Sequence, residues 1–443
     1  MQFSDLNLNS PLLNALNDLG ITQPTTIQER AFPVIMSGRD VVGIAQTGTG
    51  KTIAYLLPSL RSWKFTKEKH PQILIVVPTR ELVVQVVEQV EKLTAYMNVR
   101  VAGVYGGVNM IRQSPLILNG LDILVATPGR LLDFALNGTL KLRLVKRFII
   151  DEVDEMLNLG FRPQLIRVMD LLPPRRQNLM FSATITAELQ EFIADYFTDP
   201  IEIEAAKTGT PLENIKQIGI KVPNFNTKIN LLEFFLKTEP SFTKVLLFVS
   251  TKKMADNVFE RISETFPESV GVIHSNKSQN NRFDTLNSFN GNELRVLIAT
   301  DIVARGLDFD DITHVVNFDV PDEPENYMHR IGRTGRVDKK GVAVTFITKD
   351  DAEYRENIQQ LMGRKIPMMK MPEEVEISTE LTEDEMPIIQ NGNSVVIKRN
   401  TEVHGAAFHE KKGKNKKVNM KIRRGEAMRI KYGKPKTRGQ KKK

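Results

Sequence analysis

Short apolar runs alternate with segments of helical periodicity through most of the 443-residue chain. In its first half the runs are Val41–Ala45, Ile73–Val77, Val101–Tyr105, Ile123–Ala126, Phe148–Ile150 and Leu179–Phe181. Runs of this length that are almost continuously apolar are typical of parallel strands buried on both faces. Between them, residues 81–93 place Leu82, Val86, Val90 and Leu93 on one helical stripe. The pattern predicts an α/β domain with a parallel sheet.

The same alternation begins again after residue 207. Further strands are predicted at Val245–Val249, Val270–Ile273, Val296–Ala299, Val315–Asp319 and Val342–Ile347. We therefore expect one α/β domain over residues 1–207, a linker over 208–214 and a second α/β domain over 215–370. From residue 371 the periodicity stops, and an acidic stretch gives way to a basic one. Because such a segment buries little apolar surface, we expect residues 371–443 to form a flexible, largely disordered extension.

Composition narrows the class of protein. The chain is 41% hydrophobic and 26% charged, which is ordinary for a globular protein. No apolar run approaches the ~20 residues of a membrane span, and the first residues lack the pattern of a signal peptide. The absence of cysteine excludes disulfides and thiolate chemistry. We expect a soluble, cytoplasmic protein with no membrane contact.

The net charge of +8 is concentrated at the C-terminus. Residues 404–443 hold sixteen lysines and arginines against two glutamates, which leaves a net charge of −6 for the rest of the chain. A mildly acidic body with a basic tail predicts a nucleic-acid partner. Two other roles for the tail stay open, a device that keeps the protein in solution and an arm that docks other proteins.

One stretch predicts a phosphate-binding loop. Residues 45–52 read AQTGTGKT, follow the apolar run 41–44 and precede a segment that can continue as a helix. Glycines let backbone N–H groups converge on phosphate oxygens, and the helix start adds a partial positive charge. Lys51 suits the β- and γ-phosphates, and the Thr52 hydroxyl suits Mg²⁺. The candidate nucleotide contacts of this loop are Thr47, Gly48, Thr49, Gly50, Lys51 and Thr52.

A run of acidic residues follows the predicted strand 148–150. It reads Asp151, Glu152, Val153 and Asp154. Carboxylates at the carboxyl end of a buried strand can hold Mg²⁺ and polarise water when a phosphate loop lies nearby. Asp151 suits the metal, through a water molecule, and Glu152 suits a general base.

These two motifs, with others in order, resemble the DEAD-box RNA helicases, which are superfamily 2 ATPases built from two RecA-like domains. Residues 20–28 (GITQPTTIQ) resemble the family's Q motif, with Phe3 seventeen places before Gly20. The further motifs are PTREL (78–82), GG (106–107), TPGR (127–130), SAT (182–184), FVST (248–251), Gln279 with Arg282, ATD (299–301), RGLD (305–308) and HRIGRTGR (329–336). The resemblance covers roughly residues 1–370.

The resemblance implies a role for each matching residue. It implies ATP and Mg²⁺ as cofactors, an adenine contact by Gln28 with Phe3, and a ribose contact by Asp308. It implies that Arg333 and Arg336 act as arginine fingers on the γ-phosphate. Hydrolysis would be coupled to domain closure by Asp154, Ser182, Thr184 and His329. The RNA contacts it implies are Arg80, Gly107, Thr127, Arg130, Thr251, Gln279, Arg282 and Thr300.

Elementary chemistry agrees with several of these roles. The amide of Gln28 offers both a donor and an acceptor, as the N6/N7 edge of adenine requires. Thr127 before Pro128 reads as a helix cap followed by proline at the first helical position, so free N–H groups point out of the helix entrance. Helix entrances beside Arg80 and Arg130 suit RNA phosphates. We expect two closing domains that bend and melt a short RNA duplex.

The sequence departs from the family pattern at three places. Val153 replaces the alanine of the family's name motif, Ile21 follows Gly20 where phenylalanine is usual, and Ser275 follows His274 where glycine is common. Val153 leaves open whether turnover is slower. Two rivals therefore stay open: a DNA helicase of the same superfamily, and an ATP-gated RNA clamp or scaffold with weak catalysis. The physiological RNA and the oligomeric state are not encoded in these motifs.

Overall fold

The first half of the chain builds a seven-stranded parallel sheet. A computed structural model describes residues 2–46, 48–205, 214–301, 309, 311–335, 339–382 and 385. The strands of the first sheet run in the order β3-β4-β2-β5-β6-β1-β7. Their bounds are β1 (Val41–Ile44), β2 (Ile73–Val76), β3 (Val101–Val104), β4 (Ile123–Ala126), β5 (Arg147–Asp151), β6 (Gln177–Ser182) and β7 (Ile201–Glu204). Six of them lie at the predicted runs, and β7 is the strand that the sequence analysis missed.

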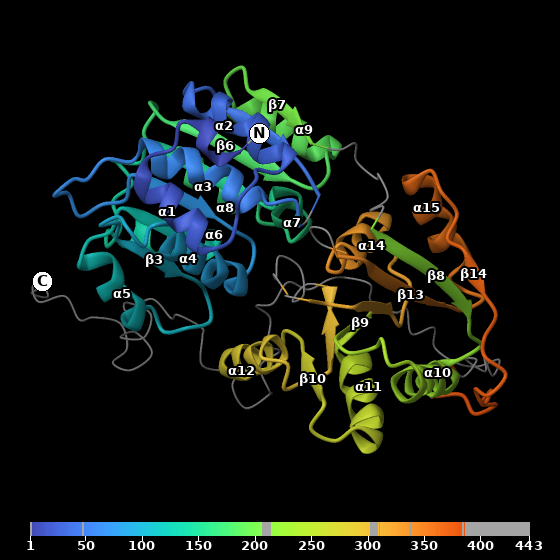
Figure 1. Cartoon of the computed structure of the whole chain (residues 1–443). Coiled ribbons are helices and arrows are strands. Elements are labelled where there is room, and N and C mark those ends of the chain that lie inside the picture. The colour runs from blue at the N-terminus through green and yellow to red at the C-terminus, as the bar shows by residue number, and fades with distance from the viewer. Residues whose placement is uncertain are drawn as a thin grey trace, which may run out of the picture. The chain divides into compact units, whose positions relative to one another are not determined.

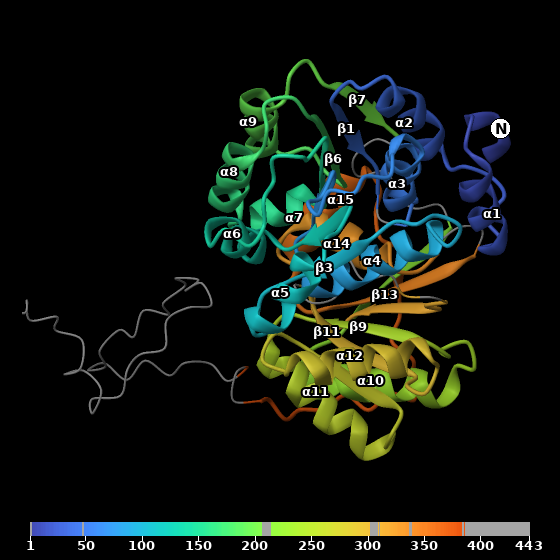
Figure 2. The same ribbon diagram turned by 90° about the vertical axis from the view of Figure 1, so that its left-hand side faces the viewer.

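Helices cover both faces of this sheet (Figures 1 and 2). They are η1 (Phe3–Leu6), α1 (Ser10–Asp18), α2 (Thr26–Met36), α3 (Lys51–Ser62), α4 (Arg80–Leu93), α5 (Met110–Leu118), α6 (Pro128–Leu136), α7 (Val153–Asn158), α8 (Arg162–Leu171) and α9 (Ala187–Tyr196). The predicted stripe of α4 is buried, and Thr79 caps that helix by accepting from the Leu82 N–H at 3.2 Å. Capping and one buried stripe are therefore enough to fix this helix on the sheet.

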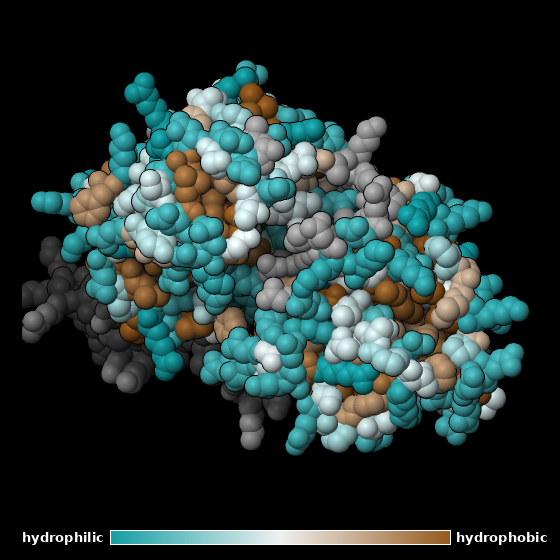
Figure 3. Space-filling model, in the orientation of Figure 1, coloured by the Kyte–Doolittle hydropathy of each residue, from teal (hydrophilic) through white to brown (hydrophobic). Residues whose placement is uncertain are grey.

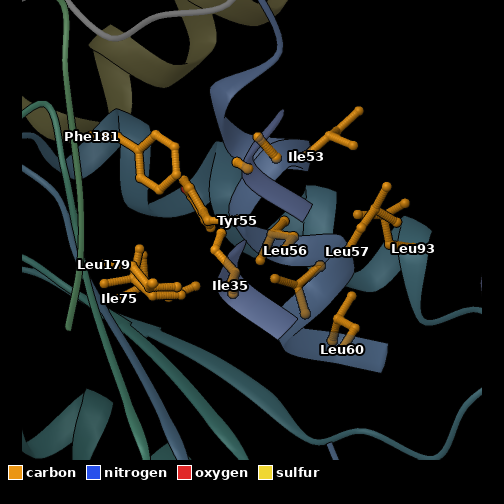
Figure 4. Packing of buried hydrophobic residues seen from close by; sticks show 14 of the residues in the cluster. Ile35, Ile53, Tyr55, Leu56, Leu57, Leu60, Ile75, Leu93, Leu179 and Phe181 are labelled. Carbon is orange, nitrogen blue, oxygen red and sulfur yellow. The ribbon is translucent and has the colours of Figure 1, made fainter. Parts of the chain in front are cut away.

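Two hydrophobic clusters lie on opposite faces of the first sheet. Neighbouring residues of one strand divide between them: Val41 belongs to the cluster under α1–α4, and Val42 to the cluster under α5–α9. Figure 4 shows the first cluster around α3, where Tyr55 lies against Phe181 of β6. Both rings are fully buried, so α3 is held close to the strands that carry the acidic residues.

The second half builds a second seven-stranded parallel sheet, in the order β10-β11-β9-β12-β13-β8-β14. Its strands are β8 (Ile215–Lys221), β9 (Val245–Val249), β10 (Val270–Ile273), β11 (Val296–Thr300), β12 (His314–Asn317), β13 (Gly341–Ile347) and β14 (Met368–Met369). The five predicted strands are confirmed. The strands β8 and β14, which lie next to each other at one end of the sheet, were missed, because β8 alternates polar with apolar residues and β14 is only two residues long.

Helices again lie on both faces of the second sheet. They are α10 (Phe225–Thr238), α11 (Lys252–Thr265), α12 (Gln279–Asn290), α14 (Pro324–Ile331) and α15 (Ala352–Met362). Helices α10 and α11 share one buried cluster with the strands, and α12, α14 and α15 contribute to clusters on the other face. The two sheets with their helices, called the first and second lobes below, confirm the expected pair of RecA-like α/β domains.

The chain stays packed on the second lobe beyond residue 370. Val375 is buried in the cluster under α10. Side chains of α10 and its cap bind backbone atoms of the following segment: Asn224 donates to the Ser378 carbonyl at 2.7 Å and Asn230 to that of Glu376 at 2.9 Å. The expected flexible extension therefore does not begin at residue 371, because amide side chains on α10 satisfy the backbone of residues 376–380. The predicted tail beyond residue 385, with residues 383 and 384, lies outside the described residues, and so does most of the predicted linker 208–214.

No helix in the described parts of the chain combines the length and apolar character that crossing a membrane requires. Figure 3 shows a face on which hydrophilic residues predominate and hydrophobic side chains are scattered. Among the exposed apolar residues are Ile111 and Leu118, both on α5.

The buried His314 makes the stability of the second lobe depend on pH. The ring is 4% exposed and stacks on Phe242 with centroids 3.8 Å apart. Burial lowers the pKa of His314 to about 4 from an ordinary value near 6.5, so the folded lobe holds the ring neutral. The contribution of the neutral His314 ring to the stability of the second lobe is fully present above about pH 6.5. It is lost as the pH falls toward 4.

We expect the free energy of unfolding of the second lobe to drop by about 1–2 kcal/mol between pH 7.5 and pH 5 through His314 alone. Urea unfolding followed at both pH values measures this drop. In His314→Phe, which keeps an aromatic ring against Phe242, the drop should shrink by that amount. An equal drop in the two proteins would contradict the assignment.

Candidate active site

The phosphate-binding loop lies between β1 and α3, as predicted. Gly48 and Gly50 have φ values of 78° and 83°, in the left-handed region that glycine adopts without strain. A β-carbon on Gly50 would lie 2.2 Å from the Gln28 Nε2, so this position also requires the absence of a side chain. Helix α3 begins at Lys51 directly after Gly50, and its first N–H groups face the loop. Thr47 lies outside the described residues.

Lys51 is the buried cation of the site. Lys51 is only 7% exposed, and its Nζ has no hydrogen-bond partner among the residues that the structure describes. A buried ammonium group without hydrogen bonds is costly. Its charge acts on three carboxylates, since it lowers the pKa of Asp151, Glu152 and Asp154 against other influences. An unpartnered cation at the start of a helix is the arrangement that suits the phosphates of a nucleotide.

The Q motif is bonded to this loop. The Gln28 Oε1 accepts from the Thr25 N–H at 3.0 Å, and its Nε2 donates to the Gly50 carbonyl at 3.1 Å. The Thr25 hydroxyl donates to the Thr49 carbonyl at 2.7 Å. One N–H and one lone pair of the Gln28 amide are left, so an adenine contact stays a prediction. Phe3, the other expected adenine contact, is 3% exposed and packs in the first-lobe core.

The acidic motif lies beside Lys51 at the end of β5. Burial raises the pKa of Asp151, while Lys51 and the Tyr55 hydroxyl oppose the rise. Glu152 has a left-handed backbone, with φ 54°, which is uncommon for a residue with a side chain and typical of functional sites. Burial raises the pKa of Glu152 to about 7, against the charges of Lys51 and Arg333. A carboxylate with a pKa near neutrality is suited to general-base work.

Asp154 links this motif to residues 182–184. Its Oδ2 accepts from the N–H groups of Ala183 and Thr184 and from the Thr184 hydroxyl, at 3.0–3.1 Å. Burial alone would raise the pKa of Asp154, but the charges of His329 and Lys51 hold it below its ordinary value. The Ser182 hydroxyl donates to the Thr184 carbonyl at 2.6 Å and orders the same turn. Val153 is fully buried in the core of the first lobe.

Residues of both lobes line one small cavity at this point. From the first lobe come Lys51, Glu152, Asp154, Glu155 and Ala183, and from the second His329 and Arg333. The cavity is far smaller than a nucleotide. The Arg333 Nε donates to the His329 carbonyl at 3.2 Å, which fixes the arginine stem to α14. Two of the expected residues, Asp308 and Arg336, lie outside the described residues.

Three expected RNA-binding residues form one hydrogen-bonded group. The Arg80 Nη1 donates to the Gln279 Oε1 at 2.9 Å, and the Gln279 Nε2 donates to the Glu81 Oε1 at 3.0 Å. The Arg282 guanidinium pairs with the same Glu81 oxygen at 2.5 Å. Gly107, with φ 77°, lies under the Arg80 guanidinium, and any β-carbon there would collide with it. The group joins α4 of the first lobe to α12 of the second.

The other expected RNA-binding residues lie at the ends of helices and strands. Thr127 precedes α6 and is followed by Pro128, as predicted, and Thr251 caps α11 by accepting from the Met254 N–H at 3.1 Å. Thr300 is the last residue of β11. Arg130 is engaged inside the first lobe: it donates to the Gln113 Oε1 at 2.6 Å and to the Val108 carbonyl at 2.7 Å. Its contact with RNA stays a prediction.

Two further residues of the site were missed in the sequence. Arg330 forms two bonds with the carboxylate of Asp301, at 2.6 and 2.7 Å, and donates to the Asp319 carbonyl at 2.7 Å. It is 2% exposed and holds α14 against the carboxyl ends of β11 and β12. Tyr55 donates to the Asp151 Oδ2 at 3.0 Å. Nothing in the helical pattern of α3 distinguishes Tyr55 from an ordinary core residue.

The residues fit a nucleotide with a small divalent cation. Among the residues that the structure describes, no group of three or more His, Cys, Asp or Glu side chains could hold a metal by itself. Mg²⁺ usually binds one or two carboxylates together with substrate phosphates and water, so Asp151 and Thr52 beside a phosphate loop are a suitable set.

A phosphate loop, a strand-end carboxylate pair and a second RecA-like lobe that adds an arginine define a nucleoside triphosphatase built from two lobes. Profiles of two domain families match the chain, the DEAD/DEAH box helicases over residues 25–192 and the helicase conserved C-terminal domain over residues 227–338. The chain belongs to the family of DEAD-box ATP-dependent RNA helicases.

Its relatives agree with this assignment. The chain is 37% identical over 374 residues to the DEAD-box ATP-dependent RNA helicase CshA of Bacillus subtilis. The matched region covers 84% of this chain and 74% of that protein. The fold matches S. cerevisiae Dbp5 bound to RNA and ADP BeF3 with a TM-score of 0.76 and 29% identity, over 84% of this chain and 95% of Dbp5. It matches Mss116p bound to ssRNA and AMP-PNP with a TM-score of 0.75 and 26% identity, over 84% and 78% of the two chains.

The raised pKa of Glu152 predicts the pH dependence of hydrolysis. A general base acts only in its deprotonated form, so kcat/KM for ATP should fall about tenfold per pH unit below about pH 7 and level off above it. Steady-state hydrolysis measured at saturating RNA between about pH 6 and 8 gives this profile. The residual rate of Glu152→Gln should not vary over the same interval. A level profile in the unmodified protein would contradict the role of Glu152.

Proposed function

We propose that this DEAD-box helicase hydrolyses ATP between its two lobes and closes on RNA to separate short duplexes or remodel RNA–protein complexes. The observation that carries the proposal is the cavity in which Lys51 and Glu152 of the first lobe meet His329 and Arg333 of the second. A reaction centre made by two lobes is complete only when they come together. ATP hydrolysis and RNA binding are then coupled, because both depend on the closing of the two lobes.

In this proposal the first lobe binds the nucleotide. The backbone of Gly48, Thr49 and Gly50 surrounds the phosphates, and the unpartnered Nζ of Lys51 neutralises them. Thr52 and Asp151 hold Mg²⁺, which would neutralise charge on the phosphate oxygens. Glu152 takes the proton of the attacking water.

The second lobe supplies the charge that the transition state needs. Arg333 lies in the cavity close enough to Glu152 to lower its pKa, and we assign it to the γ-phosphate. We assign Arg336 to the same task and Asp308 to the ribose from the family resemblance alone. Asp154 senses the second lobe, because its carboxylate interacts with His329 while it is bonded to Thr184.

RNA binding is proposed for a surface to which both lobes contribute. Arg80 of α4 already lies in one hydrogen-bonded group with Gln279 and Arg282 of α12. A sugar–phosphate backbone that reaches this group meets donors from both lobes at once. Phosphate contacts give little sequence preference, and contacts with the 2′-OH favour RNA over DNA.

Two rival functions make different predictions. A DNA helicase would be stimulated equally by DNA and RNA oligonucleotides of one sequence. An ATP-gated RNA clamp would bind RNA in the presence of ATP with negligible turnover. The relatives named as RNA helicases favour neither rival.

Replacing Arg333 tests the two-lobe site. In Arg333→Ala, RNA-stimulated kcat should fall by a factor on the order of 10³, as for other arginine fingers. The affinity for ATP without RNA should change by less than about threefold, because the first lobe makes those contacts by itself. Stopped-flow hydrolysis and nucleotide titration give the two values.

The matched control for this variant is Arg364→Ala, which removes an exposed arginine of the second lobe. It should keep the unmodified kcat. Normal hydrolysis by Arg333→Ala would show that the second lobe does not complete the site. Equal stimulation by DNA in the same assay would instead favour the DNA helicase.

The basic tail, residues 404–443, is proposed as an auxiliary RNA arm. Removing residues 405–443 should weaken RNA binding but leave RNA-stimulated hydrolysis at saturating RNA. Each lost phosphate contact should flatten the slope of log K against log salt by about 0.7. Titration of a labelled single strand at several salt concentrations measures the slope. An unchanged slope would assign the tail to solubility or to docking of another protein.

The division into residues 1–207, 208–214, 215–370 and 371–443 remains part of this proposal, amended by the packing of residues 371–382 on α10. The cytoplasmic location expected from the sequence also stays a prediction.

A further inference from the structure

Tyr55 lies at the point where α3 passes the acidic motif. It is one helical turn beyond Thr52 and fully buried. Its ring packs on Phe181 (Figure 4). The ring centroids are 5.3 Å apart and the planes are tilted by 51°. A buried phenol hydroxyl needs a hydrogen-bond partner, and the choice of partner carries information about its role.

The partner of Tyr55 is a carboxylate of the reaction centre. The hydroxyl donates to the Asp151 Oδ2 at 3.0 Å, while the Asp151 Oδ1 accepts from the Glu152 N–H at 3.0 Å. Each oxygen of Asp151 therefore has its own donor, and the plane of the carboxylate is fixed.

We propose that Tyr55 is a positioning residue of the Mg²⁺ site: its hydroxyl, which donates to the Asp151 Oδ2, sets the orientation of that carboxylate before the cation arrives. The inference rests on the proposed function, in which Asp151 and Thr52 hold Mg²⁺. Mg²⁺ demands a nearly ideal octahedral arrangement, so ligands that rotate freely lose affinity for it. Residues that orient metal ligands typically contribute 10–100-fold to metal affinity or activity.

The rival explanation is that Tyr55 fills the core and Asp151 merely satisfies its hydroxyl. Tyr327 offers a matched comparison in the second lobe. It is also fully buried, and its hydroxyl donates at 3.0 Å to the Oε1 of Gln217, a residue with no assigned role at the nucleotide. Removing either hydroxyl deletes one buried hydrogen bond and keeps the ring. Only the loss at Tyr55 should change the requirement for Mg²⁺.

The experiment compares Tyr55→Phe and Tyr327→Phe in the full-length chain. A fluorescent, non-hydrolysable ATP analogue is titrated in EDTA and then at increasing Mg²⁺ concentration. In Tyr55→Phe the Mg²⁺ concentration that gives half of the binding change should rise about tenfold, while binding in EDTA stays within about twofold. In Tyr327→Phe both values should equal those of the unmodified protein. Thermal unfolding of each variant measures the structural cost of the lost hydroxyl.

Every other outcome contradicts either the positioning role of Tyr55 or the proposed metal site. An unchanged or lower Mg²⁺ requirement in Tyr55→Phe, in a protein that unfolds cooperatively, would overturn the positioning role and leave the proposed function intact. The same rise in Tyr327→Phe would mean that any lost core hydroxyl has this effect, and would overturn it too. If the unmodified protein bound the analogue without any response to Mg²⁺, the proposed metal site itself would be wrong, and this inference with it.

Discussion

A buried ammonium group without a hydrogen bond is the constraint on which this site depends. The Nζ of Lys51 is buried, and in the described parts of the chain it meets no hydrogen-bond acceptor, only the charges of three nearby carboxylates. Such an arrangement is costly in an empty site and favourable once an anion arrives. The surrounding elements serve to maintain it. Glycines with left-handed φ shape the loop, Gln28 ties that loop to α2, and Tyr55 and Thr184 hold carboxylates in place.

The second lobe acts on this cluster through charge. Arg333 opposes the raised pKa of Glu152, and His329 helps to keep Asp154 ionised. Withdrawing the second lobe would leave the acidic groups of the first with less compensation. The protonation of the base and the position of the lobes are thus linked thermodynamically, because each biases the other. No separate signalling element is needed for ATP chemistry to respond to what the second lobe binds.

Much of the fold and of the candidate site could be predicted from the sequence. The strands and contacts that were missed share a physical reason. Central strands such as β2 and β9 were found because burial on both faces makes them continuously apolar. The edge strand β7 was missed because its IEIE pattern exposes every second residue. Lys51 and Glu152 stand in local motifs that a sequence displays. The hydrogen bonds of Arg130 with Gln113 and of Tyr55 with Asp151 join residues from different elements. The sequence near an arginine or a tyrosine does not indicate which distant residue it will bind.

The left-handed backbone of Glu152 has a consequence for how this protein could be engineered. Only glycine, and to a smaller extent asparagine or aspartate, occupies such a conformation without appreciable strain. Glutamate stands there although the backbone disfavours it, as expected if its carboxylate is the general base of the proposed reaction. A campaign that selects variants for heat resistance alone would therefore drift toward glycine at this position and discard the reaction while improving the fold. Selection for thermal stability favours glycine at residue 152, whereas selection for turnover favours glutamate.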